Sequence, residues 1–109
     1  MKILHLILKK RWYDMIASGE KTEEYREIKP YWSNRLFKGY THVCFHLGYT
    51  AKTMLFPIIG IAEDTGKEEW GAEKGKTYYV IKLGNYVTEY ACYRGVRRRA
   101  YIAALLPTD

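Results

Sequence analysis

Short strand-like segments recur along this chain of 109 residues, and turn residues separate them. Residues 2–9 (KILHLILK) are rich in Ile and Leu and are typical of a buried strand. Residues 41–48 alternate, with Val43, Phe45 and Leu47 on one face. Further strands are expected over residues 22–28, 53–63, 77–83 and 86–90. Five or six short strands in about a hundred residues favour a fold built around a small barrel.

One early segment has a helical pattern instead. Residues 11–18 place Trp12, Met15 and Ile16 at helical spacing. Gly19 follows directly, and glycine is the residue that most often ends a helix. We therefore expect a short helix between the first and second strands.

Prolines and turn residues mark the remaining boundaries. Pro30 opens a short helical turn over residues 30–36, because proline suits the first helical position. Pro57 indicates an edge or a bulge, since it cannot donate to a strand ladder. Residues 64–67 and 69–72 are expected to form turns.

The C-terminal segment, residues 93–106, has an apolar end (AYIAALL) that is typical of a helix. No internal repeat or linker divides the chain, so residues 1–109 are expected to form a single domain. The sequence thus predicts an α+β fold: a small β-barrel of five to six strands, an early helix and a C-terminal helical tail.

The composition favours a polyanionic partner. Lys and Arg number 18 against 12 Asp and Glu, which gives a net charge of +6. Basic side chains bind phosphates and release their counterions. The chain also has 11 Tyr, 3 Trp and 3 Phe, and such residues suit both strands and stacking surfaces.

The cysteines and the N-terminus predict neither a metal site nor a membrane-spanning segment. Cys44 lies in an apolar run and is expected to be a small buried side chain. No Cys/His spacing resembles a zinc site, so neither a metal nor a cofactor is expected. The apolar N-terminal run is too short to span a bilayer, and we expect a soluble, cytoplasmic protein without a membrane partner.

The segment GEKTEEYR directly follows the predicted helix and has charges of both signs. Strand alternation places Glu24 and Arg26 on one face, and Lys21 at the turn can reach the same side. Lys21 and Arg26 can each hold a phosphate, and Arg26 can also stack on a base. Glu24 between them is expected to stay ionised and to accept from an exocyclic amine. The alternative is a structural ion-pair network.

The spacing Gly19-x-Lys21-x-x-Glu24-x-Arg26 resembles the signature of the activating signal cointegrator homology (ASCH) domain, and the resemblance covers roughly residues 2–84. It implies a PUA-like β-barrel whose cleft binds RNA or a nucleotide. By position, Lys21, Glu24 and Arg26 would line that cleft.

Two further functions remain open. Some ASCH-like proteins are amidohydrolases acting on acylated cytidine, and ribonuclease activity is suggested for others. The amidohydrolases have a threonine where this chain has Glu24, which argues against that activity; if the chain is an enzyme, Lys21 and Glu24 are its candidate catalytic residues. The other alternative is an adaptor that binds a protein through the basic tail at Arg94 and Arg97–Arg99.

Four residues outside the motif complete the candidate binding site. Trp32 could stack on a base or cover the end of the barrel, and Arg35 could hold a phosphate or be an ordinary surface cation. His46 is expected on the face opposite Phe45, where it is structural or reaches the cleft. Tyr49 follows this strand and is the last of the candidate RNA-binding residues.

Overall fold

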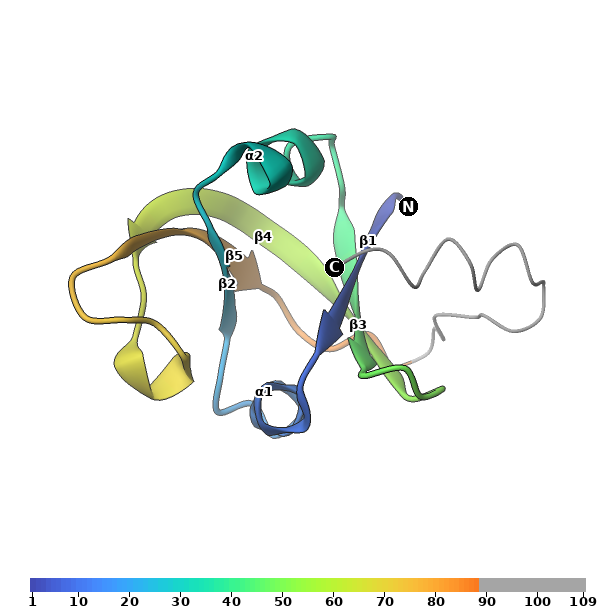
Figure 1. Ribbon diagram of the computed structural model, residues 1–109. Coiled ribbons are helices and arrows are strands. Elements are labelled where there is room, and N and C mark those ends of the chain that lie inside the picture. Colours follow the sequence, from blue (N-terminus) through green and yellow to red (C-terminus); the bar gives the residue numbers. More distant parts are fainter. Residues whose placement is uncertain (89–109) are drawn as a thin grey trace.

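The computed structural model describes residues 1–88, which form a curled mixed sheet with two helices at its open side (Figure 1). The elements within these residues are, in chain order, β1 (Ile3–Leu8), α1 (Lys10–Ala17), β2 (Glu23–Glu27), α2 (Pro30–Leu36), β3 (His42–Leu47), β4 (Thr53–Thr65), a 3₁₀ turn (Glu68–Trp70) and β5 (Thr77–Leu83). The α+β class is confirmed. The predicted tail helix over residues 93–106, with its arginines, lies outside the described residues.

The described strands have the order β1-β3-β4-β5-β2, so β1 and β2 are the two edge strands. β1 pairs with β3 in parallel, and the other pairings are antiparallel. The long strand β4 pairs through its first half with β3 and through its second half with β5. This shared strand curls the sheet into half a barrel whose opening lies between β1 and β2 (Figure 1).

The irregularity expected near Pro57 occurs slightly later, as a register shift between Ile58 and Gly60. β4 then continues to Thr65, so the turn predicted over residues 64–67 was placed too early. The last predicted strand is not formed over residues 86–88, and residues 89–90 lie outside the described part. Val87 nevertheless donates its backbone N–H to the Leu55 carbonyl at 2.9 Å, beside β4.

Helix α1 packs Tyr13 and Ile16 into the main core, which is built from the inner faces of β1, β3, β4 and β5. Trp12 and Met15 are half-buried on one side of this stripe, and Met15 contacts a second cluster that includes Trp70 of the 3₁₀ turn. Gly19 ends the helix as predicted, with a φ of 87° that a side chain would strain. The helix therefore contacts both the main core and the loop around the 3₁₀ turn.

Burial of Tyr13 gives a testable alkaline signature. Burial, together with nearby Tyr86 and Asp14, raises the pKa of Tyr13 from 10.0 to about 12. Above pH 10 the unfolded chain loses this proton first, so the folded state binds more protons and stability falls as pH rises toward 12. Between pH 10 and 11, we expect the free energy of unfolding of the wild type to fall by about 1 kcal/mol more than that of Tyr13→Phe. Urea unfolding of both proteins at these two pH values measures this difference. An equal fall in the free energy of unfolding for both proteins would contradict the prediction.

Candidate functional site

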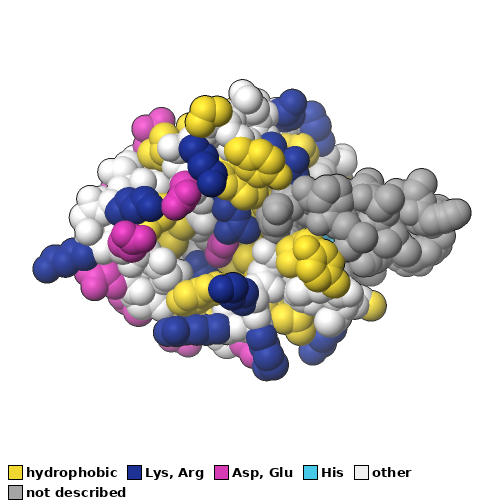
Figure 2. Space-filling view, viewed as in Figure 1, with side chains coloured by type: hydrophobic (Ala, Val, Ile, Leu, Met, Phe, Trp, Pro, Cys, Tyr) yellow, Lys and Arg dark blue, Asp and Glu magenta, His cyan; other side chains and the backbone are white. Residues whose placement is uncertain are grey.

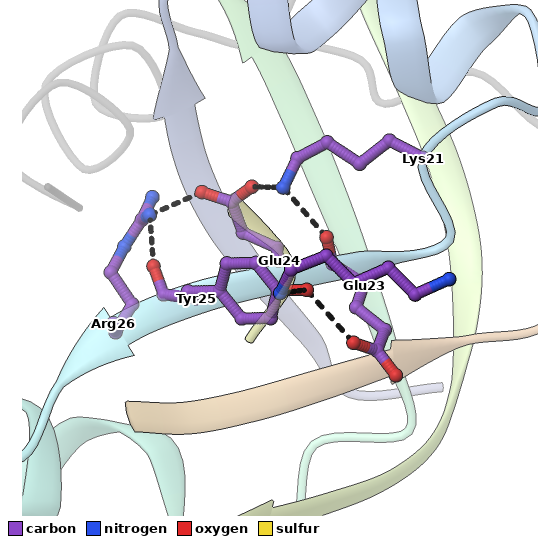
Figure 3. Close-up of polar contacts among 6 residues, drawn as sticks. Lys21, Glu23, Glu24, Tyr25 and Arg26 are labelled. Carbon is purple, nitrogen blue, oxygen red and sulfur yellow. Dashed lines mark hydrogen bonds and ion pairs between the residues drawn. The ribbon is translucent and has the colours of Figure 1, made fainter. Parts of the chain in front are cut away.

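The motif side chains form a continuous ion-pair network, drawn in Figure 3. The Lys21 ammonium lies 3.0 Å from Glu24 Oε1 and donates to the Glu23 carbonyl at 2.7 Å. Arg26 Nη1 pairs with Glu24 Oε2 and donates to the Tyr25 carbonyl at 3.0 Å. Glu24 is thus the anion between two cations, and the expectation that the three residues converge is confirmed.

The local fold explains why these residues meet. After Gly19 the chain reverses, and the Lys21 N–H donates to the Met15 carbonyl at 3.0 Å. This bond fixes the start of the lysine side chain beside α1, from where it points back over β2 (Figure 3). Strand alternation then puts Glu24 and Arg26 on the same side of β2.

The network is buried to different depths. The Lys21 side chain is 1% exposed and that of Glu24 is 7%, whereas Arg26 is 14% exposed. Burial lowers the pKa of Lys21, although its attraction to Glu24 opposes the shift. The rings of Trp12 and Tyr25 lie 5.5 and 4.7 Å from its ammonium and add cation–π contacts. Arg26 is therefore the member of the motif that is closest to solvent.

Tyr25 faces the other side of β2 and ties the following loop to the sheet. Its hydroxyl donates to Glu23 Oε1 at 2.9 Å and accepts from the Lys67 N–H at 3.0 Å. Burial raises the pKa of this hydroxyl, so it stays protonated. Gly71, with a φ of 103°, lets the same loop approach the Trp12 ring, where an added Cβ would lie 3.0 Å from the indole. The loop thus packs its backbone at Gly71 against the Trp12 indole.

A hollow of about 280 Å³ lies at the opening between the two edge strands. We call it the seam pocket. It is lined by Ile7, Leu8, Lys9, Trp12, Arg26 and Trp32. These residues come from the end of β1, from α1, from β2 and from α2, which surround the opening in Figure 1.

Two indoles and a guanidinium dominate the seam pocket. The Arg26 guanidinium lies 5.1 Å from the Trp32 ring centroid, and Trp12 contributes the ring on the α1 side. Trp32 is itself part of the main core, so only part of its ring faces the pocket. Lysine and arginine side chains are numerous on this face of the molecule, with acidic side chains among them (Figure 2).

A second hollow, of about 290 Å³, lies at the C-terminal end of α1. Lys21, Phe56, Leu83 and Tyr86 contribute to its lining. Lys21 reaches it only with its stem, because the ammonium is directed to Glu23 and Glu24. Arg26 thus lines the seam pocket and Lys21 lines the second hollow, while Glu24 pairs with both.

The remaining predicted residues have different surroundings. Arg35 lies against the rings of Tyr31 and Trp32, at 5.2 and 5.8 Å. Tyr49 is an exposed residue in the turn after β3. His46 is opposite Phe45 as predicted, but it is buried beside His5 and Cys44. Among the described residues that line the seam pocket, only Arg26 and Trp32 were predicted from the sequence.

Of the four lining residues that sequence reasoning missed, Trp12 and Lys9 are the ones with an aromatic ring or a charge. Trp12 was assigned to the apolar stripe of the helix, where a tryptophan is usually a core residue. Its position directly after the cluster Lys9, Lys10 and Arg11 was the available signal, because an aromatic ring next to cations is common in ligand sites.

The sequence matches no protein-family model, no curated protein and no solved structure. Neither helix of the described part is long and apolar enough to cross a bilayer.

Proposed function

We propose that this chain is an ASCH-like domain with a PUA-like barrel that binds single-stranded RNA or a nucleotide in the seam pocket. One observation carries the proposal: two indole rings and a partly exposed guanidinium converge at the opening of the half-barrel. The motif resemblance and the net charge of +6 support the same partner class.

The lining chemistry suits a nucleobase and its phosphate. Single-stranded bases bind by stacking on aromatic rings and on arginine planes. Arg26 can present its planar fork to a phosphate, and Lys9 at the rim can add a second cation. A volume of about 280 Å³ is near the lower end of typical ligand pockets, about 300–1,000 Å³, and suits one nucleotide at a time.

Lys21 and Glu24 act as positioning residues in this proposal. Both are buried, and Glu24 holds the Arg26 guanidinium by one carboxylate oxygen while Lys21 holds the other. An arginine held in this way loses little conformational freedom when it binds, which is the benefit of a preorganised site. The motif therefore serves as one unit in which Arg26 meets the ligand.

Binding is preferred to the two alternatives. A hydrolase would need Lys21 or Glu24 to act on a substrate, and each is committed to a buried ion pair. An adaptor acting through the basic tail would not use the seam pocket.

The test is a fluorescence-anisotropy titration of a short single-stranded RNA at two salt concentrations, with mononucleotides as competitors. We expect Arg26→Ala to weaken binding about tenfold and to reduce the salt slope by about one. Arg26→Lys should keep the salt slope and recover only part of the affinity, because lysine lacks the planar fork.

Lys82→Ala is the matched control, since it removes one charge from the exposed face of β5. It should leave binding nearly unchanged. Circular dichroism of each variant checks that the fold is intact. Wild-type affinity in a folded Arg26→Ala protein would contradict binding in the seam pocket. Competition by a mononucleotide would identify a nucleotide site, and its absence a requirement for a longer strand.

A further inference from the structure

Two histidines and a cysteine meet on the outer face of the sheet, away from the seam pocket. In the parallel pairing of β1 and β3, His5 is the register partner of Cys44, and His46 follows two residues later on the same face. The main core lies on the opposite face, with Leu4, Leu6 and Phe45. The fold thus brings together three metal-ligating side chains from distant parts of the sequence.

The distances between their ligand atoms fit a tetrahedral ion. His5 Nδ1 lies 2.9 Å from His46 Nε2, and Cys44 Sγ lies 3.5 Å from the same Nε2. All three atoms lie within 4.8 Å of one another. Zinc bonds of about 2.0–2.1 Å to nitrogen and 2.3 Å to sulfur imply separations of roughly 3.3 Å between nitrogens and 3.6 Å between nitrogen and sulfur. The two separations that involve His46 are within a few tenths of an ångström of these values, and the His5–Cys44 separation, at most 4.8 Å, would have to close to about 3.6 Å.

The surroundings favour a structural metal over a catalytic cysteine. Cys44 is 0% exposed and His46 is 3% exposed. Cys44 packs against Leu55, and the chain after β5 adds Val87 to this cluster. A buried thiol has no access for a substrate, so Cys44 is better placed as a metal ligand than as a nucleophile, and thiolate and imidazole are ligands that zinc takes in proteins.

The oxidation state of Cys44 decides whether the site can form. The structure has Cys44 in a disulfide, and the only other cysteine of the sequence, Cys92, lies outside the described residues. Reduction of the disulfide gives two thiols: two thiol molecules supply two electrons and two protons, whereas a phosphine supplies the two electrons, becomes the phosphine oxide, and takes the oxygen and the two protons from water. The Cys44 thiol then loses its proton when it binds a metal, since the thiolate is the ligand. In a reducing compartment, Cys and His clusters are more often metal sites than disulfides.

We propose that His5, Cys44 and His46 form a thiol-dependent site for a divalent ion of the zinc class, which is lost when Cys44 is oxidised. Three protein ligands leave one position of the tetrahedron for a further ligand. The ion would link β1 to β3 on the outer face of the sheet, opposite the main core. This inference is independent of nucleotide binding.

The test is a cobalt(II) titration of the full-length protein after reduction with a phosphine, followed by zinc in competition with a chromophoric chelator. We expect one equivalent of cobalt, with the near-ultraviolet charge-transfer band of a thiolate ligand and the visible bands of a tetrahedral ion. Zinc should displace it and raise Tm. The oxidised protein should show no thiolate band.

Substitutions locate the ligands. Loss of an outer-shell partner already costs about 10–100-fold in metal affinity, so His46→Gln and Cys44→Ser should each cost at least about a hundredfold. His42→Gln is the matched control, because this third histidine lies on the same strand and bonds Thr41 Oγ1 at 2.7 Å instead. It should bind zinc as the wild type does.

Several results would overturn the site. They are no stoichiometric cobalt binding by the reduced wild type, a thiolate band that persists in Cys44→Ser, or undiminished zinc affinity in His46→Gln. If Cys44→Ser does not fold, metal binding is compared between the reduced and oxidised wild-type proteins. It is also measured in His5→Gln, a substitution at a half-buried position. Equal metal binding by the reduced and oxidised proteins would then refute the thiol dependence.

Discussion

Replacing Glu24 by glutamine should lower the free energy of unfolding by about 3–5 kcal/mol, the range found when one partner of a buried pair is removed. Glutamine keeps the size of the side chain and removes its charge. The Lys21 ammonium would then remain in the interior beside the Arg26 guanidinium, with no anion between them. An unpaired buried charge is among the most costly defects a fold can contain.

Lys21→Met should cost clearly less, although it removes a partner of the same ion pair. Methionine fills much of the lysine volume, and Glu24 keeps its pairing with Arg26. The desolvation that lowers the pKa of Lys21 is also relieved. The asymmetry between the two single substitutions follows from the position of the anion between two cations.

Urea unfolding of the two single variants and the double variant measures this difference. In the Glu24→Gln background, Lys21→Met should restore part of the lost stability, because it removes the stranded cation. Coupling of this sign is what contacting residues show in a double-mutant cycle. Equal costs for both single variants, or purely additive costs, would mean that the network is solvated and does not hold Arg26 in place.

The sequence predicted the elements that local chemistry determines. Gly19 and Pro30 end and begin helices because glycine tolerates a positive φ and proline suits the first helical turn. Alternation placed Glu24 and Arg26 together because the strand period is two residues. These features depend on neighbours along the chain, and so a single sequence was sufficient.

The sequence did not predict the features that depend on strand order. The parallel pairing of β1 with β3 joins His5 to Cys44 across 39 residues, and no local spacing marks it. The same strand order leaves β1 and β2 as edges and so creates the seam pocket. For this reason Trp12 was interpreted as a core residue, and His46 could be assigned to a structural role or to the cleft.

Trp12→Ala should weaken the binding of single-stranded RNA by about 1–3 kcal/mol, the contribution of one stacked base. Trp12 is the better probe of stacking because it is only half-buried, whereas Trp32 belongs to the main core. Truncating Trp32 would combine a loss of stacking with a core cavity costing about 3–5 kcal/mol of stability. Trp12→Phe keeps an aromatic face and should retain most of the affinity.

The comparison of single-stranded with duplex RNA separates stacking from charge. A base can enter the seam pocket only when it is free of its partner strand, so Trp12→Ala should reduce single-stranded binding and leave duplex binding nearly constant. Because the substitution removes no charge, the salt slope should stay at the wild-type value, in contrast to Arg26→Ala. Equal losses on both RNAs would exclude base stacking on Trp12. An unchanged affinity for single strands would mean that Arg26 binds phosphate without any base in the pocket.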